Sequence, residues 1–463
     1  MTVAPGSRAR PARRAPTDLP FRFAEVDLAR ALSAERGEPD WLRDERIAAF
    51  EVFASLPIES NLLYTTYLDL RNAELEAALP YVRTATGPDT GADAALPDGV
   101  AGLIELREDG VASLALEPAA SDAGVLLETF GSALARDPDG FRAELEGGAG
   151  LPAGDKFAAL ARGFWSQGVR LHIPAGVRLA RPIVVRWAVG AADRALIGRT
   201  RITVGDGAEA SIVEELQPSG PVAPGGGQSL LASTMEVTLG RDAKLAVSSL
   251  QELPTSTVAF QHRHAVIGEG ASLHWAVAQL GSRLVRSRVD NVLEGDRSTV
   301  EQVEIVFGGE DQLFDLTSYT RHIGRDTTGN LLSKGALLDR ARSFMKGMIV
   351  IDRSAVGTDS FLGEFGMNLS KATRSVAIPS LEIDQPDCRR AAHASSVGPI
   401  DESQLFYLES RGIPPDDARK FIVLGFLEPV VARVPLAEAQ DRLRELLEAK
   451  WDAGTGAGAD AAA

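Results

Sequence analysis

The five-residue phrase "VGDGA" (Val204–Ala208) returns along the middle of the chain with small changes. It reads LGRDA from Leu239, IGEGA from Ile267, IGRDT from Ile323 and VGTDS from Val356. In each copy an aliphatic residue ends a strand-like run, glycine permits a turn, and a small residue begins the next run. The copies start 35, 28, 56 and 33 residues apart, and 56 is twice 28. This spacing predicts a repeat of about 28 residues with two longer insertions.

The segments between these phrases have the alternation of β-strands. Runs such as "STMEVTL" and "TVAFQHRHAVI" are β-branched or alternate between apolar and polar residues, and no long helical pattern interrupts residues 169–383. A fixed period in an all-β region is typical of a solenoid, in which each coil packs on the next, and the loop "QPSGPVAPGGGQS" is one predicted insertion. An antiparallel sandwich with similar turns is the alternative, and the spacing alone leaves both open.

The region before the strands is mixed and largely helical. "PDWLRDERIAAFEVFASLP" places apolar residues three apart from Ile47 to Leu56, which predicts a helix that stops at Pro57. "GVAGLIELREDGVASLALEP" predicts two short strands around Asp109 and Gly110.

Three helices are predicted near the C-terminus. Asp401 and Gln404 occupy the N-cap and N3 positions of a capping box, and Gly412 suits the position just after the helix. A second helix should begin at Pro414–Pro415 and end at Pro429, and the third contains "PLAEAQDRLRELLEAKW". Short helices make a thin core, so their spare apolar faces need the rest of the protein or a partner.

Composition narrows the functional class. The formal net charge is −16, which argues against nucleic acid or an anionic membrane as the main partner. The single cysteine excludes an intrachain disulfide framework, and no apolar run approaches the ~20 residues of a membrane helix, so we expect a cytoplasmic protein. The arginine-rich start "MTVAPGSRARPARRAPTD" predicts a disordered tail, with a transit peptide as the alternative.

Catalytic signatures are missing from the sequence. It contains no GxxxxGK[ST], GxSxG, HExxH or CxxC motif. His262 and His264 share one face of a predicted strand, but "QHRHA" has no carboxylate or thiolate beside them, so we expect an exposed β-face rather than a metal site. Neighbouring arginines favour the thiolate of Cys388, yet the chain offers no second cysteine. These residues indicate a binding or scaffold protein more than an enzyme.

The C-terminal third resembles the SufB/SufD family of iron–sulfur cluster assembly proteins. The segments that carry the resemblance are "PSLEI" (Pro379–Ile383), then His393, then "GPIDESQLFYLESRGI" (Gly398–Ile413). "DKFAALARGFWSQGVRLHIPAGVRLARPIVV" and "FASLPIESNLLYTTYLDLRN" extend the resemblance over nearly the whole chain between the two ends.

Within that family the chain is more similar to SufD than to SufB. "SKATRSVAIP" lacks the cysteine that SufB proteins carry there, and Ala392 and Ala394 stand where SufB has glutamates beside the histidine. SufD proteins often have a cysteine two residues before the histidine, but here that residue is Ala391, which puts thiol ligation by this chain in doubt.

The resemblance implies a mainly β fold with a right-handed parallel β-helix core, an N-terminal mostly helical domain and a C-terminal helical module. The expected parts are a disordered tail at 1–20, the N-terminal domain at 21–168, the β-helix at 169–398, the helical module at 399–452 and a disordered tail at 453–463.

The resemblance also implies a non-enzymatic scaffold subunit that pairs with a SufB-like β-helix subunit and docks a SufC-like ATPase. No intrinsic cofactor is expected, only a transient iron–sulfur cluster at the interface with the SufB-like subunit. His393 is the expected contributor to that cluster site, unless it only fixes a turn by bonding to backbone, and Cys388 is a weaker metal candidate. The expected ATPase-docking residues are Asp401, Gln404, Leu405, Phe406, Tyr407, Arg411 and Gly412.

Two other interpretations of the function remain open. The chain could be a SufB-like scaffold that holds the nascent cluster itself, although its single cysteine counts against this. It could instead be a β-helix enzyme acting on carbohydrate, which would need paired carboxylates or basic residues in a cleft among the strands.

Overall fold

The computed structural model describes residues 21, 23–67, 69–70, 73–80, 92–93, 95–147, 152, 154–220, 227–434 and 437–459. The predicted N-terminal tail at 1–20 lies outside the described residues.

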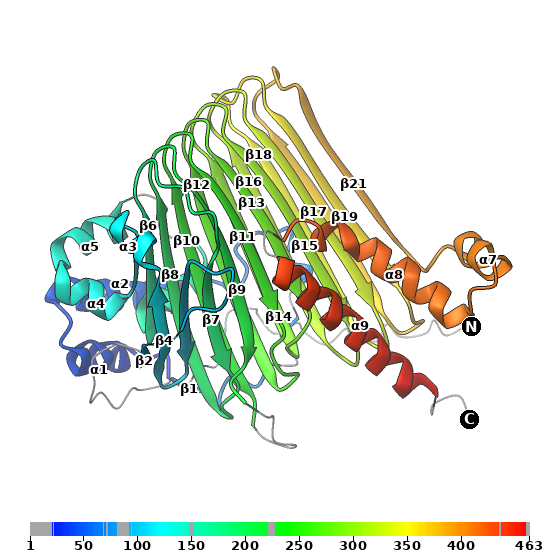
Figure 1. The fold of residues 1–463 in the computed structure, drawn as a ribbon, viewed down its shortest axis with the longest axis horizontal. Coiled ribbons are helices and arrows are strands. Elements are labelled where there is room, and N and C mark those ends of the chain that lie inside the picture. The colour runs from blue at the N-terminus through cyan, green and yellow to red at the C-terminus, as the bar shows by residue number, and fades with distance from the viewer. Residues whose placement is uncertain are drawn as a thin grey trace, which may run out of the picture.

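Two long sheets face each other, and the chain alternates between them strand by strand (Figure 1). Sheet A contains β6 (Gln167–Ile173), β8 (Arg194–Val204), β10 (Ser229–Leu239), β12 (Thr257–Ile267), β14 (Leu284–Leu293), β16 (Leu313–His322), β18 (Arg342–Ile351) and β20 (Arg374–Ile383). Sheet B contains β7 (Ile183–Val189), β9 (Glu209–Pro218), β11 (Lys244–Gln251), β13 (Ser272–Gln279), β15 (Thr299–Gly308), β17 (Thr328–Leu337), β19 (Asp359–Asn368) and β21 (Arg390–Gly398). Each of these strands pairs in parallel with the strand one coil away. The solenoid prediction is therefore confirmed, and the antiparallel sandwich is wrong.

The register gives the length of each coil. The predicted repeat of about 28 residues is confirmed, and the coil that contains "QPSGPVAPGGGQS" is longer, as expected. The step between paired residues is 28 from Ser229 to Thr257, 31 from Thr328 to Asp359 and 35 from Glu209 to Lys244.

The turn phrase works differently from the prediction. In its first four copies the left-handed residue is the fourth one, Gly207, Asp242, Gly270 or Asp326, rather than the glycine that all copies share at the second position. The backbone N–H of this fourth residue donates to a carbonyl in the following turn, as from Gly270 to Asp296 at 2.8 Å. Glycine or aspartate occurs here because both tolerate this conformation better than bulky residues do.

The shared second glycine is required for close approach between coils. A Cβ on Gly268 would lie 2.6 Å from the carbonyl oxygen of Leu239, and one on Gly240 would lie 2.8 Å from the backbone nitrogen of Asp206. Backbone atoms of the preceding coil cannot move aside as a flexible side chain can. The repeated glycine therefore sets how tightly successive coils stack.

We predict that Gly268→Ala lowers the free energy of unfolding by about 1–3 kcal/mol, because the added methyl group forces neighbouring coils apart. Chemical denaturation followed by circular dichroism would measure the change. Gly425→Ala is the matched control, since a Cβ there meets nothing within 4 Å and alanine favours a helix. Equal stability of the Gly268→Ala and wild-type proteins would contradict the close-approach argument.

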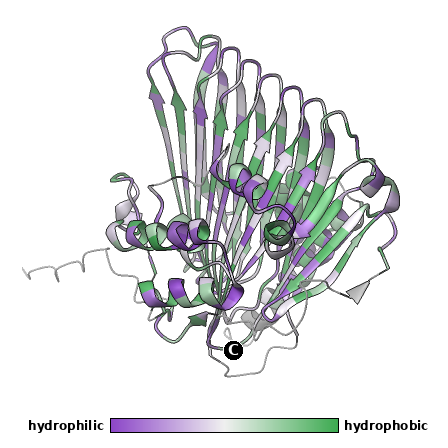
Figure 2. Cartoon of the chain, turned by 90° about the vertical axis from the view of Figure 1, so that its left-hand side faces the viewer, coloured by the Kyte–Doolittle hydropathy of each residue, from purple (hydrophilic) through white to green (hydrophobic). Residues whose placement is uncertain are grey.

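Helices of the N-terminal region cover one end of the solenoid, which Figure 2 views from that end. They are α1 (Val26–Arg36), α2 (Asp40–Ser55), α3 (Pro118–Asp122), α4 (Phe130–Arg136), α5 (Pro138–Glu146) and α6 (Lys156–Phe164), the last of which also packs on β8, β10 and β12 of sheet A. η1 (Thr65–Tyr67) lies farther along sheet A, where the Tyr67 ring packs on Phe344 of β18. The helix predicted to stop at Pro57 is confirmed as α2.

Short strands join this region to both sheets. The predicted hairpin is confirmed as β3 (Gly102–Arg107) and β4 (Gly110–Leu116), and β3 continues sheet B by pairing in parallel with β7. On sheet A, β5 (Leu126–Thr129) pairs antiparallel with β6 and β1 (Leu79–Pro80) pairs in parallel with β8. β2 (Ala92–Asp93) lies at the outer end of sheet B, on β4.

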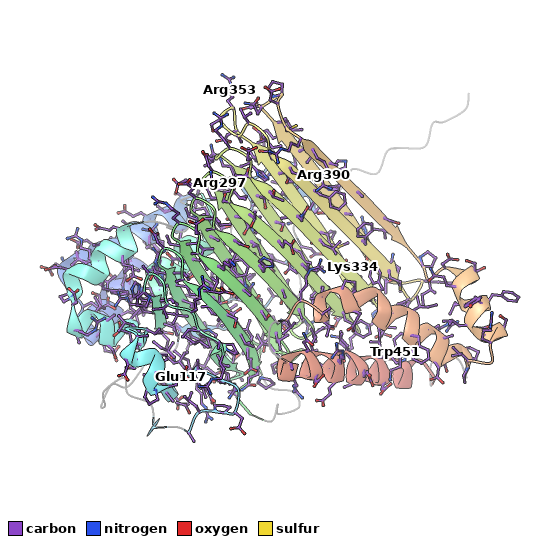
Figure 3. All side chains as sticks on the ribbon, turned by 45° about the horizontal axis from the view of Figure 1, so that its top comes forward. Glu117, Arg297, Lys334, Arg353, Arg390 and Trp451 are labelled. Atoms are coloured by element: carbon purple, nitrogen blue, oxygen red, sulfur yellow. The ribbon has the colours of Figure 1, made fainter. Side chains whose placement is uncertain are left out.

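Three C-terminal helices follow the last strand: α7 (Glu402–Ser410), α8 (Pro415–Val431) and α9 (Ala437–Ala459). α8 and α9 lie against the outer face of sheet B (Figure 1). Buried side chains such as Leu427 and Trp451 pack there on Ile305 and its neighbours. Lys334, labelled beside α8 in Figure 3, donates to the carbonyl oxygen of Phe426 at 2.9 Å.

Two helix ends differ from the prediction. Pro429 does not stop α8, which continues to Val431, because a proline so near the end removes a single helical hydrogen bond while buried Val430 and Val431 hold the last turn. α9 runs to Ala459, into the segment predicted as a tail, although Gly454, Gly456 and Gly458 disfavour a helix there. None of the described helices combines the length and apolar character needed to cross a membrane.

Candidate functional site

The solenoid has one open end, formed by β20 and β21. Each is the last strand of its sheet, so within the described chain β20 pairs only with β18, and β21 only with β19. Such edge strands present unpaired backbone groups. Two apolar side chains are also exposed here, Ile383 at 44% and Val397 at 40%. We call β20 and β21 the open end.

His393 lies in the middle of β21, on the face that points between the two sheets. Its register partner Leu362 is buried in a cluster that contains residues of both sheets, and register partners in parallel strands share a face. His393 itself is exposed because no further coil covers it. The alternative that His393 fixes a turn is wrong, since the residue belongs to a strand.

Glu364 of β19 lies on the same inner face and was not identified from the sequence. Its Oε2 accepts a hydrogen bond of 2.8 Å from the backbone N–H of Ile378, so the carboxyl group reaches from sheet B to β20 of sheet A. The side chain is 1% exposed. Burial raises the pKa of Glu364 to about 8, although the Ile378 N–H lowers it in part. The sequence signal that could have identified Glu364 is an acidic residue at an inward-facing position of a predicted strand.

Cys388 occupies the turn between β20 and β21. It is partly buried and packs with Leu381 and Ala391, five residues before His393 in the chain. The part of the chain that the structure describes has no cluster of three or more His, Cys, Asp or Glu residues able to hold a metal ion. The open end thus offers donor groups without a complete ligand set.

His262 and His264 are buried, so the prediction of an exposed face is wrong. They lie on the outer face of sheet A, 3% and 8% exposed. Asp155, the N-cap residue of α6, faces Nδ1 of His262 at 3.3 Å, and Asp290 of β14 faces Nε2 at 2.6 Å. No carboxylate stands beside these histidines in the sequence, because Asp155 and Asp290 come from distant segments of the chain.

This cluster joins the N-terminal region to the solenoid. Burial disfavours the imidazolium of His262, but attraction to Asp155 and Asp290 outweighs it and raises the histidine pKa. Burial likewise favours the protonated form of Asp290, yet Arg288 and His262 lower its pKa to about 2. Asp155 also accepts from the Ala158 N–H at 2.8 Å, so one carboxylate caps α6 and ties it to sheet A.

We predict that His262→Gln destabilises the protein by about 3 kcal/mol at pH 6, because it removes the charge between two buried carboxylates. The raised pKa means that the imidazolium contributes fully below the ordinary value of about 6.5, and that this contribution is lost as the pH rises through the folded-state pKa. The difference in unfolding free energy between the variant and the wild type should therefore become smaller toward pH 9. Thermal denaturation across this range measures it.

His274→Gln is the matched control, since His274 is an exposed histidine on β13. If the stability difference between the His262→Gln and wild-type proteins stays constant with pH, the histidine is neutral in the folded protein.

A second candidate surface is the helical hairpin of α7 and α8. Asp401 is the N-cap of α7 as predicted, and its carboxylate accepts from the Ser403 N–H at 2.8 Å. The Ser403 side chain and backbone lower the pKa of Asp401. Gly412 has φ +85° and ends the helix as predicted.

The apolar side chains of α7 remain uncovered by this chain. Phe406 is 74% and Tyr407 56% exposed, and Leu405 is half-buried. Arg411 lies over the Tyr407 ring at 5.2 Å. α7 stands away from the two sheets (Figure 1), and none of its residues is buried.

A family model described as "SUF system FeS cluster assembly, SufBD core domain" matches residues 187–426, more than half of the chain. The matched region includes most of both sheets, the open end and most of α8.

Similar whole proteins carry corresponding names. An iron–sulfur cluster assembly SufBD family protein of Staphylococcus haemolyticus is 25% identical over 430 residues, which cover 90% of this chain and 91% of that protein. A protein of the same description from Staphylococcus aureus strain USA300 has the same identity and coverage.

Proposed function

Because the chain belongs to the SufBD family of SUF-system iron–sulfur cluster assembly proteins, we propose that it is a SufD-type scaffold subunit. In this proposal it pairs with a SufB-like β-helix subunit, docks a SufC-like ATPase, and works in the cytoplasm without catalysing a reaction itself. The cluster is cargo, held for a time at the interface between the two β-helix subunits.

The observation that carries the proposal is the open end. A parallel solenoid that stops without a cap leaves two strand edges and the apolar side chains of Ile383 and Val397 exposed. A second β-helix subunit satisfies both, because its own edge strands can continue the ladders. His393 then lies at the junction, and an imidazole nitrogen is a suitable iron ligand.

The donor set favours the SufD role over the SufB role. Cys388 is the only cysteine of the chain, and its side chain packs against apolar neighbours in a turn. The side chains flanking His393 are those of Ala392 and Ala394. A subunit with one imidazole and no thiolate beside it needs sulfur ligands from elsewhere, so the cluster sulfur chemistry is assigned to the SufB-like partner.

The α7–α8 hairpin is the proposed ATPase-docking surface. Its Asp401 cap and Gly412 turn give the hairpin a defined shape, and Phe406 and Tyr407 offer aromatic anchors of the kind that dominate protein interfaces. α8 also packs on sheet B through Val423 and Leu427. Movement of a docked ATPase would therefore be transmitted to the solenoid through α8.

We predict that Val397→Lys abolishes pairing with the SufB-like subunit, because a lysine would be buried without a counter-charge at the interface. Co-expression followed by gel filtration should show at least about a tenfold loss of the heterodimer. Leu79→Lys is the matched control, since Leu79 is an exposed leucine of sheet A on β1, at the opposite end of the solenoid. Normal pairing by the Val397→Lys protein would argue against the open end as the interface.

We predict that Phe406→Asp releases the ATPase while pairing between the β-helix subunits persists. The substitution removes an aromatic anchor and adds a charge on α7, so the affinity should fall at least about tenfold. Pull-down of the ATPase on the tagged chain measures it, with Leu62→Asp as a control on an exposed N-terminal leucine. Retention of the ATPase by the Phe406→Asp protein would move the docking surface elsewhere.

A further inference from the structure

We propose that Glu364 and His393 together form an iron-binding site at the open end, with one carboxylate oxygen and one imidazole nitrogen, which the partner subunit completes. This inference deepens the proposed function and rests on it. It concerns the iron of the cargo before or during cluster formation.

The register places the two side chains together. Glu364 is in register with Ser395, and His393 lies two residues earlier on the same strand. Alternate residues share a face, so all three point between the sheets, and strand geometry puts the Glu364 and His393 Cα atoms about 8 Å apart. Two side chains of this length can reach a single metal ion across that distance.

The Glu364 carboxyl lies level with the last coil, although β19 is one coil earlier. Its bond to the Ile378 N–H brings it against β20, the final strand of sheet A. Gly347 of β18 leaves room for it, since a Cβ there would lie 2.9 Å from Glu364 Oε1. The carboxyl therefore occupies the space between the sheets at the level where a partner would meet this chain.

Other inward carboxylates of the same row have donors from the protein itself. Glu214 forms an ion pair of 2.6 Å with Arg263, and Glu304 accepts from the Ser287 hydroxyl at 2.8 Å. Successive register pairs place Glu304, Ser333 and Glu364 in one line along sheet B.

Glu364 differs from these carboxylates in its counter-charge, because Arg263 pairs with Glu214 and also attracts the Glu304 carboxyl, whereas in the described part of the chain no such cation faces Glu364. Among the residues that the structure describes, no ion pair includes it, and its bond to the Ile378 N–H comes from neutral backbone. Burying a carboxylate without a cation is costly. A divalent iron ion entering at the open end supplies that cation, and the carboxyl proton passes to water as the oxygen binds.

The chemistry of the pair suits ferrous iron. Imidazole nitrogen with carboxylate oxygen is a recurring donor set for Fe²⁺. Two donors leave most coordination positions vacant, in agreement with the absence of a complete metal cluster among the described residues. The remaining ligands are assigned to the partner surface and to sulfide.

The test uses the full chain assembled with its β-helix partner and the ATPase. Wild type, Glu364→Gln, His393→Ala and Glu304→Gln complexes are titrated anaerobically with Fe²⁺, and bound iron is measured after desalting. Co²⁺ in place of Fe²⁺ gives visible absorption bands that report the ligands. Glu304→Gln is the matched control, because it makes the same change on the same inner row, two coils before Glu364.

We expect Glu364→Gln and His393→Ala each to weaken iron binding at least about tenfold, since even groups that only orient a ligand have effects of that size. Glu304→Gln should bind iron as wild type does. The Co²⁺ spectrum should change in the first two variants and not in the third. Gln retains an oxygen for the Ile378 N–H, so assembly is expected to survive.

Other outcomes separate the inference from the proposed function. Normal iron binding by Glu364→Gln beside loss in His393→Ala overturns the role of Glu364 and leaves the scaffold proposal standing. A wild-type complex that assembles but binds no iron overturns the inference, whereas failure of the wild-type subunits to assemble overturns the scaffold proposal as well. Loss of assembly in both Glu364→Gln and Glu364→Asp would make Glu364 a structural residue and also overturn the inference.

Discussion

Hydrogen bonding between successive coils is the constraint on which this structure depends. Each strand of the solenoid is satisfied only by the strands one coil before and one coil after it. The chain can cover the first coil with its N-terminal helices, but at β20 and β21 it ends the ladders without a cap. Uncovered strand edges and exposed apolar side chains favour unwanted pairing with other chains. A specific partner that covers the open end would prevent that pairing.

Buried charged groups in the middle of the solenoid and at its open end differ in their partners. Midway along sheet A, Asp155, His262, Asp290 and Arg288 form a closed network in which every charge meets an opposite charge. At the open end the buried carboxyl of Glu364 meets backbone instead, and His393 faces solvent. Compensated charges hold two parts of one chain together, and uncompensated ones are available to a ligand from outside.

The sequence contains the repeat because stacking demands the same small residue at each corner, and that demand recurs once per coil. It does not show which glycine serves close approach and which serves the left-handed turn, since both depend on the neighbouring coil. His262 was misjudged for a related reason, as its carboxylate partners lie in α6 and β14. Glu364 was missed because its importance depends on how the solenoid ends. His393 was found through a motif, and its inward direction needed the register.

The coil-by-coil register also has a consequence for synthesis. Because each coil contacts mainly its neighbours, the ribosome delivers the solenoid in an order in which it can fold, starting from the helical end. β21 and the α7–α8 hairpin leave the ribosome among the last elements. A truncated chain could form a well-packed stack of coils and still lack the surfaces proposed for both partners. Assembly with those partners would then act as a check that translation reached its end.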